Sequence, residues 1–195
     1  PRISGSIIAH IDSTESGQYA ELDEHGRYKV SLPFDLSGHE AGKGSTWIRM
    51  AQPYVGSNHG MHFPLHKNTE VLLTFIDGDP DRPVIAAAVP NPETPSPVSS
   101  SNQTMSVIQT GGQNRISIED KAGSERMLFQ SPKADSFIRI GTPNDPDKND
   151  APDYYKIFDD DGVAIHTKGG ITINGMVKNE IVIGETTETI ALAYT

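Results

Sequence analysis

Three aspartates alternate in the stretch FIDGDPDRPVI, at Asp77, Asp79 and Asp81. Oxygen ligands at every second residue begin many loops that bind a hard cation such as calcium. An EF-hand loop also needs glycine at its sixth position and a carboxylate at its twelfth, where this chain has Arg82 and Ala88. Glycine, proline and aspartate are equally the residues that form turns. The stretch therefore predicts a connection between two strands and no metal site.

A second acidic stretch, residues 145–162, begins with the same alternation. It has Asp150 where the calcium loop needs glycine and Lys156 where it needs the final carboxylate. The composition predicts a polar insertion over residues 142–161. Whether this insertion holds a weakly bound cation is left open by the sequence.

Three histidines, His59, His62 and His66, are spaced as zinc ligands on a helix are. Gly60 and Pro64 lie between them and would break such a helix. The spacing therefore predicts no zinc site.

Motifs for nucleotides and nucleophiles are incomplete or missing. GHEAGKGS, residues 38–45, resembles a phosphate-binding loop but is one residue short before Gly42 and Lys43, and it has Gly44 where serine or threonine is required. The chain has no cysteine and no G-x-S-x-G motif. We predict no catalytic residue, no cofactor and no enzymatic activity. A pair of carboxylates in a groove stays possible, although no spacing indicates one.

The composition limits the partners of this chain of 195 residues. Its 16 basic and 26 acidic residues give a net charge of −10, which argues against nucleic acid, since phosphate binding needs clustered cations. The longest apolar run, Val84 to Val89, is too short to cross a bilayer. The chain begins at Pro1 without methionine, so we expect a piece of a longer protein.

Short apolar stretches with period two and frequent turns predict an all-β protein. Residues 1–90 contain five such stretches, with an irregular stretch at 55–67 between the third and fourth, and they predict an OB-fold barrel. Residues 91–104 are rich in proline and serine and predict an extended linker. Residues 105–195 have a different texture, with apolar-x-apolar dyads separated by glycines.

The dyads predict a β-helix stem, because short β segments that repeat in this way are typical of solenoids. The predicted core residues of the stem are Ile116, Ile118, Ile138, Ile140, Val163, Ile165, Ile171, Ile173, Ile181 and Ile183. Each buried side chain contributes about 1.5–3 kcal/mol, whereas ordering each residue costs about 1–2 kcal/mol in backbone entropy. One chain therefore has too few inward-facing side chains for a stable core, and we predict an intertwined homotrimer. A monomeric solenoid is the alternative.

Three stretches resemble the VgrG spike family of the type VI secretion system and the related baseplate spikes of contractile-tailed phages. They are GRYKVSLPFD, STWIRMAQPYVGSNHGMHFPLHKNTEVLLTFIDGDPDRPVI and NRISIEDKAGSERMLF. The resemblance covers the chain from about Gly26 to Phe129. It implies an OB-fold domain followed by a triple-stranded β-helix, forming a trimeric needle.

The resemblance also implies partners and a place of action. Members of the family sit on a hexameric tube protein and carry a conical tip protein or effectors. They are assembled in the bacterial cytoplasm and injected through the type VI apparatus, and they meet the target-cell membrane only by mechanical penetration. The chain departs from the family in lacking the large N-terminal domains, in PLHKNTEV, and in the insertion near Asp145.

Alternative functions remain beside the cell-puncturing spike. A phage tail baseplate spike fits the same stretches. A carbohydrate-active β-helix is a further alternative, although few aromatic residues follow Pro90. A single-strand-binding OB fold would need a basic groove with stacking aromatics, which the charge balance opposes.

Overall fold

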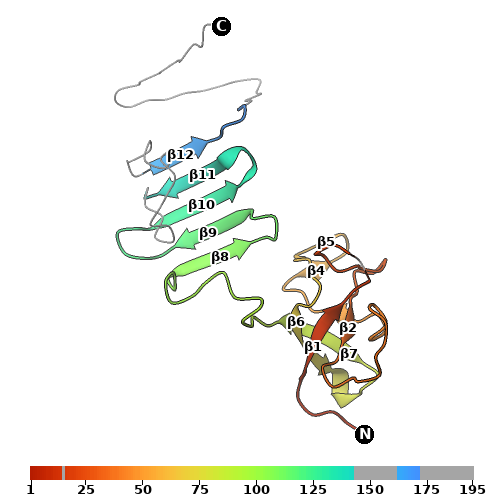
Figure 1. The fold of residues 1–195 in the computed structure, drawn as a ribbon. Coiled ribbons are helices and arrows are strands. Elements are labelled where there is room, and N and C mark those ends of the chain that lie inside the picture. The colour runs from red at the N-terminus through yellow and green to blue at the C-terminus, as the bar shows by residue number, and fades with distance from the viewer. Residues whose placement is uncertain (15, 143–161, 172–195) are drawn as a thin grey trace, which may run out of the picture. The chain divides into compact units, whose positions relative to one another are not determined.

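The computed structural model of the protein describes residues 1–14, 16–142 and 162–171 (Figure 1). The chain divides into two compact units, Pro1–Pro97 and Val98–Thr195, which we call the barrel unit and the sheet unit. The boundary falls inside the predicted linker. No helix in the described part of the chain is long and apolar enough to cross a bilayer. Three predicted core residues, Ile173, Ile181 and Ile183, lie outside the described residues, as does most of the insertion at 142–161.

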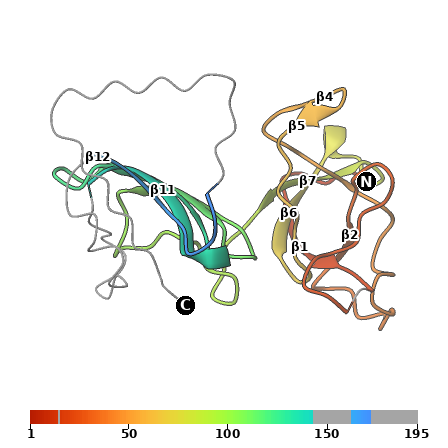
Figure 2. The ribbon, with the colours of Figure 1, turned by 90° about the horizontal axis from the view of Figure 1, so that it is seen from above.

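The barrel unit contains a five-stranded sheet in the order β2-β1-β6-β7-β3. Its strands are β1 (Ile7–Asp12), β2 (Lys29–Ser31), β3 (Arg49–Met50), β6 (Glu70–Phe75) and β7 (Pro83–Ala88). The pairs are antiparallel except β3 with β7, which is parallel. Tyr28 and Ile48 exchange two backbone hydrogen bonds of 3.0 and 2.7 Å. This bridge joins the two ends of the order and closes the sheet into an OB-type barrel, as the sequence predicted (Figure 2).

The barrel encloses one core of aliphatic side chains and a single tyrosine. The buried members are Ala9, Ile11, Tyr28, Val30, Ile48, Val71, Leu73 and Ile85. They come from every wall of the barrel because inward-facing residues alternate along each strand. The hydroxyl of Tyr28 accepts a hydrogen bond of 2.9 Å from the backbone N–H of Leu65, so its polar atom is satisfied inside the core.

A small hairpin lies in the stretch that the sequence left irregular. It consists of β4 (Val55–Gly56) and β5 (His59–Gly60), joined through Asn58 at φ 60°. Both strands are exposed, and in Figures 1 and 2 the hairpin stands beside the barrel strands. The sequence missed it because two-residue strands are too short for a period to be recognised.

The sheet unit contains a five-stranded antiparallel meander in the order β8-β9-β10-β11-β12. Its strands are β8 (Met105–Gln109), β9 (Arg115–Glu119), β10 (Arg126–Ser131), β11 (Ser136–Gly141) and β12 (Gly162–His166). Three predicted dyads lie on β9, β11 and β12. Figure 1 shows these strands stacked as successive rungs.

Candidate functional site

The aspartate loop that follows β6 is a strand connection, as predicted. It begins with a short 3-10 turn, Ile76–Gly78, in which Asp77 has φ 55°. The carboxylate of Asp79 accepts the backbone N–H of Asp81 at 3.0 Å. Arg82 lies 3.3 Å from the carboxylate of Asp77. These aspartates therefore fix the backbone of a turn before β7 begins.

The three histidines of the zinc-like spacing contact three different tyrosines. The ring centroids are 5.3 Å apart for Tyr54 and His59, 6.4 Å for Tyr28 and His62, and 4.5 Å for Tyr19 and His66. In the described part of the chain, no three His, Cys, Asp or Glu side chains are grouped to hold a metal. The histidines act as ring partners along the stretch between β3 and β6.

The phosphate-loop-like stretch encloses a side chain of the barrel itself. The N–H groups of Gly42 and Gly44 donate to the two carboxylate oxygens of Asp12, at 2.8 and 2.9 Å. A Cβ on Gly44 would lie 2.7 Å from the carbonyl oxygen of Val30, which explains glycine at this position. The loop therefore binds a carboxylate of its own chain, and its anion-binding geometry serves the fold.

The electrostatics of Asp12 follow from this enclosure. Burial acts to raise the pKa of its carboxyl, but the amide hydrogen bonds from Gly42, Gly44 and Ser13, together with nearby His39, outweigh it and hold the pKa below the ordinary value. Asp12 is thus a buried, ionised anchor between the end of β1 and the loop before β3.

The main candidate site is an apolar surface on one face of the sheet unit. Strand register places its residues in two rows that cross all five strands. We call these rows the apolar stripe. The first row is Ile108, Ile116, Phe129, Ile138 and Ile165, and the second is Ile118, Met127, Ile140 and Val163, with Ser106 as its member on β8.

The apolar stripe is open to solvent in the single chain. Its members are 36–70% exposed, whereas fully burying each would contribute about 1.5–3 kcal/mol. Residues two apart on a strand are about 7 Å apart and neighbouring strands about 4.8 Å apart, so the stripe is about 7 Å wide and about 19 Å long. A continuous apolar surface that stays open on a folded protein is a candidate contact site.

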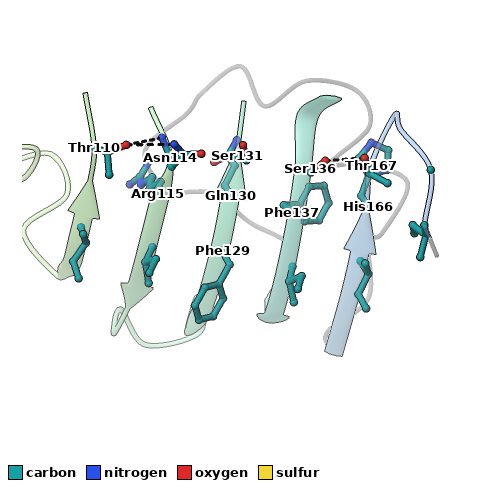
Figure 3. A pocket seen from close by; sticks show the side chains of 16 residues that line it. Thr110, Asn114, Arg115, Phe129, Gln130, Ser131, Ser136, Phe137, His166 and Thr167 are labelled. Atoms are coloured by element: carbon teal, nitrogen blue, oxygen red, sulfur yellow. Dashed lines mark hydrogen bonds between the residues drawn. The ribbon is translucent and has the colours of Figure 1, made fainter. Parts of the chain in front are cut away.

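Polar residues flank the apolar stripe on the same face. At one end of the strands the next positions are Thr110, Asn114, Ser131, Ser136 and Thr167. Figure 3 shows this row beside Phe129, with Ser136 donating to Thr167 at 2.7 Å. Asp120, Glu125 and Thr142 occupy the corresponding positions at the other end. The apolar surface is therefore two residues wide and no wider.

A groove of about 580 Å³ lies along the first row of the stripe (Figure 3). The turn after β12 contributes Gly170 and Ile171 to its wall, so the predicted core residue Ile171 lies beside the stripe. In the same groove Phe137 and His166 stack at a centroid distance of 5.3 Å. The lining is aliphatic and aromatic, with hydroxyl and amide groups, Arg115 and His166 at one end, and its described residues include no pair of carboxylates.

The opposite face of the sheet carries charged side chains that are buried. Glu119, Arg126 and Arg139 are 2–5% exposed. The Oε1 atom of Glu119 accepts the backbone N–H of Lys121 at 2.8 Å. The usual antiparallel sheet buries its apolar face and exposes its polar one. Here the face with the apolar stripe is the open one, while the buried face combines these charged side chains with the apolar Leu128 and Phe137.

The structure places seven of the ten predicted core residues in the apolar stripe or beside it. Three further apolar residues of the stripe were not predicted from the sequence. Ile108, Met127 and Phe129 complete the two rows. MLF in β10 contains an apolar-x-apolar dyad, Met127 and Phe129, as clear as the others. The signal that identifies them is register, since cross-strand neighbours on one face share a role.

Comparisons with known proteins agree with this architecture. Residues 19–89 match the family model described as the type VI secretion system/phage-baseplate injector OB domain. The type VI secretion system spike protein VgrG3 of Vibrio cholerae is 32% identical over 139 residues, which is 68% of this chain and 14% of VgrG3. The actin cross-linking toxin VgrG1 of the same species is also 32% identical over 139 residues, 68% of this chain and 13% of the toxin.

A relative from a second organism covers slightly more of the chain. The spike protein VgrG4b of Pseudomonas aeruginosa is 30% identical over 155 residues, which is 72% of this chain and 19% of VgrG4b. The chain therefore spans less than a fifth of the length of these relatives. An injector OB domain joined to a rung-like β-sheet, together with these matches, shows that the chain belongs to the VgrG family of spike proteins.

Proposed function

We propose that this chain is part of a trimeric, cell-puncturing spike in which three copies bury their apolar stripes against one another. The observation that carries the proposal is the stripe itself: two rows across five strands, apolar at every position except Ser106, that are open in the single chain. The names of the relatives support the same role, since VgrG3 and VgrG4b are spike proteins of the type VI secretion system.

The width of the apolar stripe favours three copies over two. Two sheets stacked face to face would also bury the flanking rows, including the carboxylates of Asp120 and Glu125, which is costly without partners. Three sheets that form the three sides of a triangular prism bring only their central stripes together around the axis. Their polar flanks then stay at the corners, within reach of water.

Further dyads along the chain would lengthen the shaft. Ile171 and Ile173, then Ile181 and Ile183, repeat the apolar-x-apolar spacing of the stripe. In the proposed stem they form further rungs, with backbone hydrogen bonds directed along the axis. A shaft of this kind resists bending because each strand is paired on both edges and no strand leaves alone.

In this proposal the spike is mechanical and not enzymatic. It sits on a hexameric tube, carries a tip protein or an effector, and is assembled in the bacterial cytoplasm before injection. The family model covers phage baseplates as well as type VI systems, so a phage baseplate spike is the second candidate. The toxin activity in the name of VgrG1 belongs to that protein, of which this chain matches 13%.

The mass of the assembly in solution tests the proposal. Light scattering on the chain at micromolar concentration is expected to give three times the chain mass of 21.1 kDa. A mass of one chain under these conditions would overturn the trimer, and a mass of two chains would overturn the triangular arrangement.

A cysteine scan tests the arrangement directly, because the protein has no cysteine of its own. Phe129→Cys places one thiol per copy at the proposed axis, so mild oxidation is expected to form disulfides between chains. Ile8→Cys, on the outer side of β1, is the matched control with comparable exposure. Equal cross-linking of the two variants would show that random collision is responsible.

A further inference from the structure

A second cavity lies in the barrel unit, far in sequence from the apolar stripe. It has a volume of about 710 Å³ and lies between β3 and the β4–β5 hairpin, with Val84 of β7 and the turn before β2 completing its wall. We call it the hairpin pocket. Its volume is within the range of sites that bind a small ligand or a short peptide.

The lining of the hairpin pocket is largely apolar, and its ionisable residues in the described part of the chain include no carboxylate. Its ionisable members are Arg27, Arg49, His25, His59 and His62. This is notable in a chain with ten more acidic than basic residues. The pocket therefore attracts negative charge that most of the protein repels.

Arg49 supplies the available positive charge. The guanidinium of Arg27 is already bound to the carboxylate of Asp23 at 2.6 Å. Arg49 is exposed, and it has no ion pair or side-chain hydrogen bond within the part of the chain that the structure describes. A planar guanidinium held at a strand is well suited to bind a carboxylate through two parallel hydrogen bonds.

The pocket also contains an open strand edge. The N–H of Ala51 bonds to the carbonyl of Ile85 on β7 at 2.8 Å, so the N–H and carbonyl of the preceding Met50 point away from β7. The antiparallel continuation of the Tyr28–Ile48 bridge would pair Met50 with Gly26. Gly26 instead turns at φ 69° and donates its N–H to Asp23.

Met50 therefore has two backbone groups without a backbone partner among residues 1–14, 16–142 and 162–171. Open edges of this kind are where an extended peptide adds a strand. Exposed apolar side chains stand nearby on and beside the hairpin, at Tyr54, Val55 and Met61. They offer contact surface on the side of the pocket opposite β3.

We propose that the hairpin pocket binds an extended segment of a partner protein that carries a carboxylate between apolar residues. Met50 pairs with the backbone of the segment, Arg49 binds its carboxylate, and Tyr54, Val55 and Met61 contact its apolar side chains. The site requires one chain only, so it does not depend on the proposed trimer.

Other ligands fit the pocket less well. A metal ion is disfavoured because His59 and His62 contact different tyrosines and the lining supplies no carboxylate. A nucleic acid needs several free cations along a groove, whereas Arg49 is the one lining arginine without an acidic partner in the described part of the chain. A single carboxylate on an extended chain matches what the pocket offers.

The test uses the whole chain and a phage-displayed library of random heptapeptides. Recovered peptides are synthesised, and their affinity is measured by fluorescence anisotropy for the wild type, Arg49→Gln and Arg82→Gln. Arg82 is the matched control, an arginine that binds Asp77 and does not line the pocket. Fluorescence of Trp47, the single tryptophan, verifies that the barrel of each variant is folded.

The expected result is a recovered sequence with Asp or Glu between apolar residues, whose affinity falls at least tenfold in Arg49→Gln and is unchanged in Arg82→Gln. Replacing the peptide carboxylate by its amide should give the same loss with the protein unaltered. Recovery of no peptide, recovery of peptides without a carboxylate, or equal binding to wild type and Arg49→Gln would each overturn the proposal.

Discussion

The barrel unit and the sheet unit each contain a five-stranded sheet with isoleucine as a prominent apolar residue, yet the core isoleucines of the first are buried and the apolar-stripe isoleucines of the second are exposed. Ile85 in the barrel is 0% exposed, while Ile138 in the sheet is 44% exposed. The difference comes from closure. The bridge between Tyr28 and Ile48 closes the barrel sheet, so that the side chains on its inner face pack against one another. The meander β8–β12 stays open.

Apolar content alone therefore does not determine whether a unit can bury its own core. In the barrel, the inward-facing residues of all the strands pack into one buried cluster. In the sheet, the corresponding residues form the apolar stripe and meet no opposite wall in the described part of the chain. The stability of the barrel is therefore expected to come from contacts within one chain, whereas the sheet is expected to need other copies to bury its apolar stripe.

Placing a charge in the apolar stripe should have the largest effect. Ile138→Asp brings three carboxylates to the proposed axis, where burying each without a partner costs several kcal/mol. The trimer is expected to dissociate at micromolar concentration, as measured by sedimentation velocity. Ile8→Asp, at a similarly exposed isoleucine of the barrel, should leave the trimer intact. If Ile138→Asp remained trimeric, the stripe would not be the contact.

Creating a cavity in the barrel should destabilise that unit alone. Ile85→Ala removes buried methyl groups and is expected to lower the free energy of unfolding by about 2–5 kcal/mol. Urea titration followed by Trp47 fluorescence reports the barrel, and the mass of the assembly should not change. A loss of trimer in this variant would contradict the independence of the two units.

Neutralising the anchor of the glycine loop should produce a pH-dependent loss of stability. Asp12→Asn removes the charge that Gly42 and Gly44 bind, and it is expected to cost about 1.5–3 kcal/mol at pH 7. The folded-state pKa of Asp12 lies below 3.8, so its stabilisation is present above pH 3.8 and is lost as the pH falls through the folded-state pKa. Urea titrations at several pH values should show wild type and variant converging in acid.

The matched control for this change is Asp81→Asn in the exposed loop before β7. Its side chain accepts no hydrogen bond in the described structure, so its stability should stay within about 0.5 kcal/mol of wild type. An equal effect of the two substitutions would mean that general charge, and not the loop, is responsible.

Removing one hydroxyl from the core should have the smallest effect. Tyr28→Phe leaves the N–H of Leu65 without its acceptor, which costs about 1–3 kcal/mol for a buried donor. The loss is measured by urea titration with Trp47 fluorescence. Tyr19→Phe, at an exposed tyrosine, should be neutral. If both were neutral, water would be replacing the Tyr28 hydroxyl.

Much of the fold could be predicted from the sequence because period-two alternation is a local property. The five barrel strands, the turn at Asp77 to Asp81 and the dyads on β9, β11 and β12 all follow from spacing within a few residues. The β4–β5 hairpin was missed because two-residue strands show no period, and Ile108 of β8 was missed because only its register with Ile116 shows its role. The β10 dyad, Met127 and Phe129, is as visible in the sequence as the other dyads and was not recognised.

The candidate sites also have some features that local sequence patterns predict and others that depend on contacts between distant residues. The length of GHEAGKGS showed that it is not a complete phosphate-binding loop. Its contact with Asp12 could not be predicted, because Gly42 and Gly44 lie 30 and 32 positions from Asp12 in the sequence. The hairpin pocket likewise combines the turn before β2, β3, the hairpin and β7. No local pattern predicts a cavity whose walls are so far apart along the chain.

The all-β class, the change of texture after residues 91–104 and the lack of cysteine follow from the amino-acid sequence alone, because they depend on composition and on side-chain alternation. Which apolar residues are enclosed depends on contacts between distant strands. Long-range pairing closes the first sheet at Tyr28 and Ile48 and leaves the second open. Burial depends on what lies opposite a side chain in space, and the identity of the side chain does not specify that.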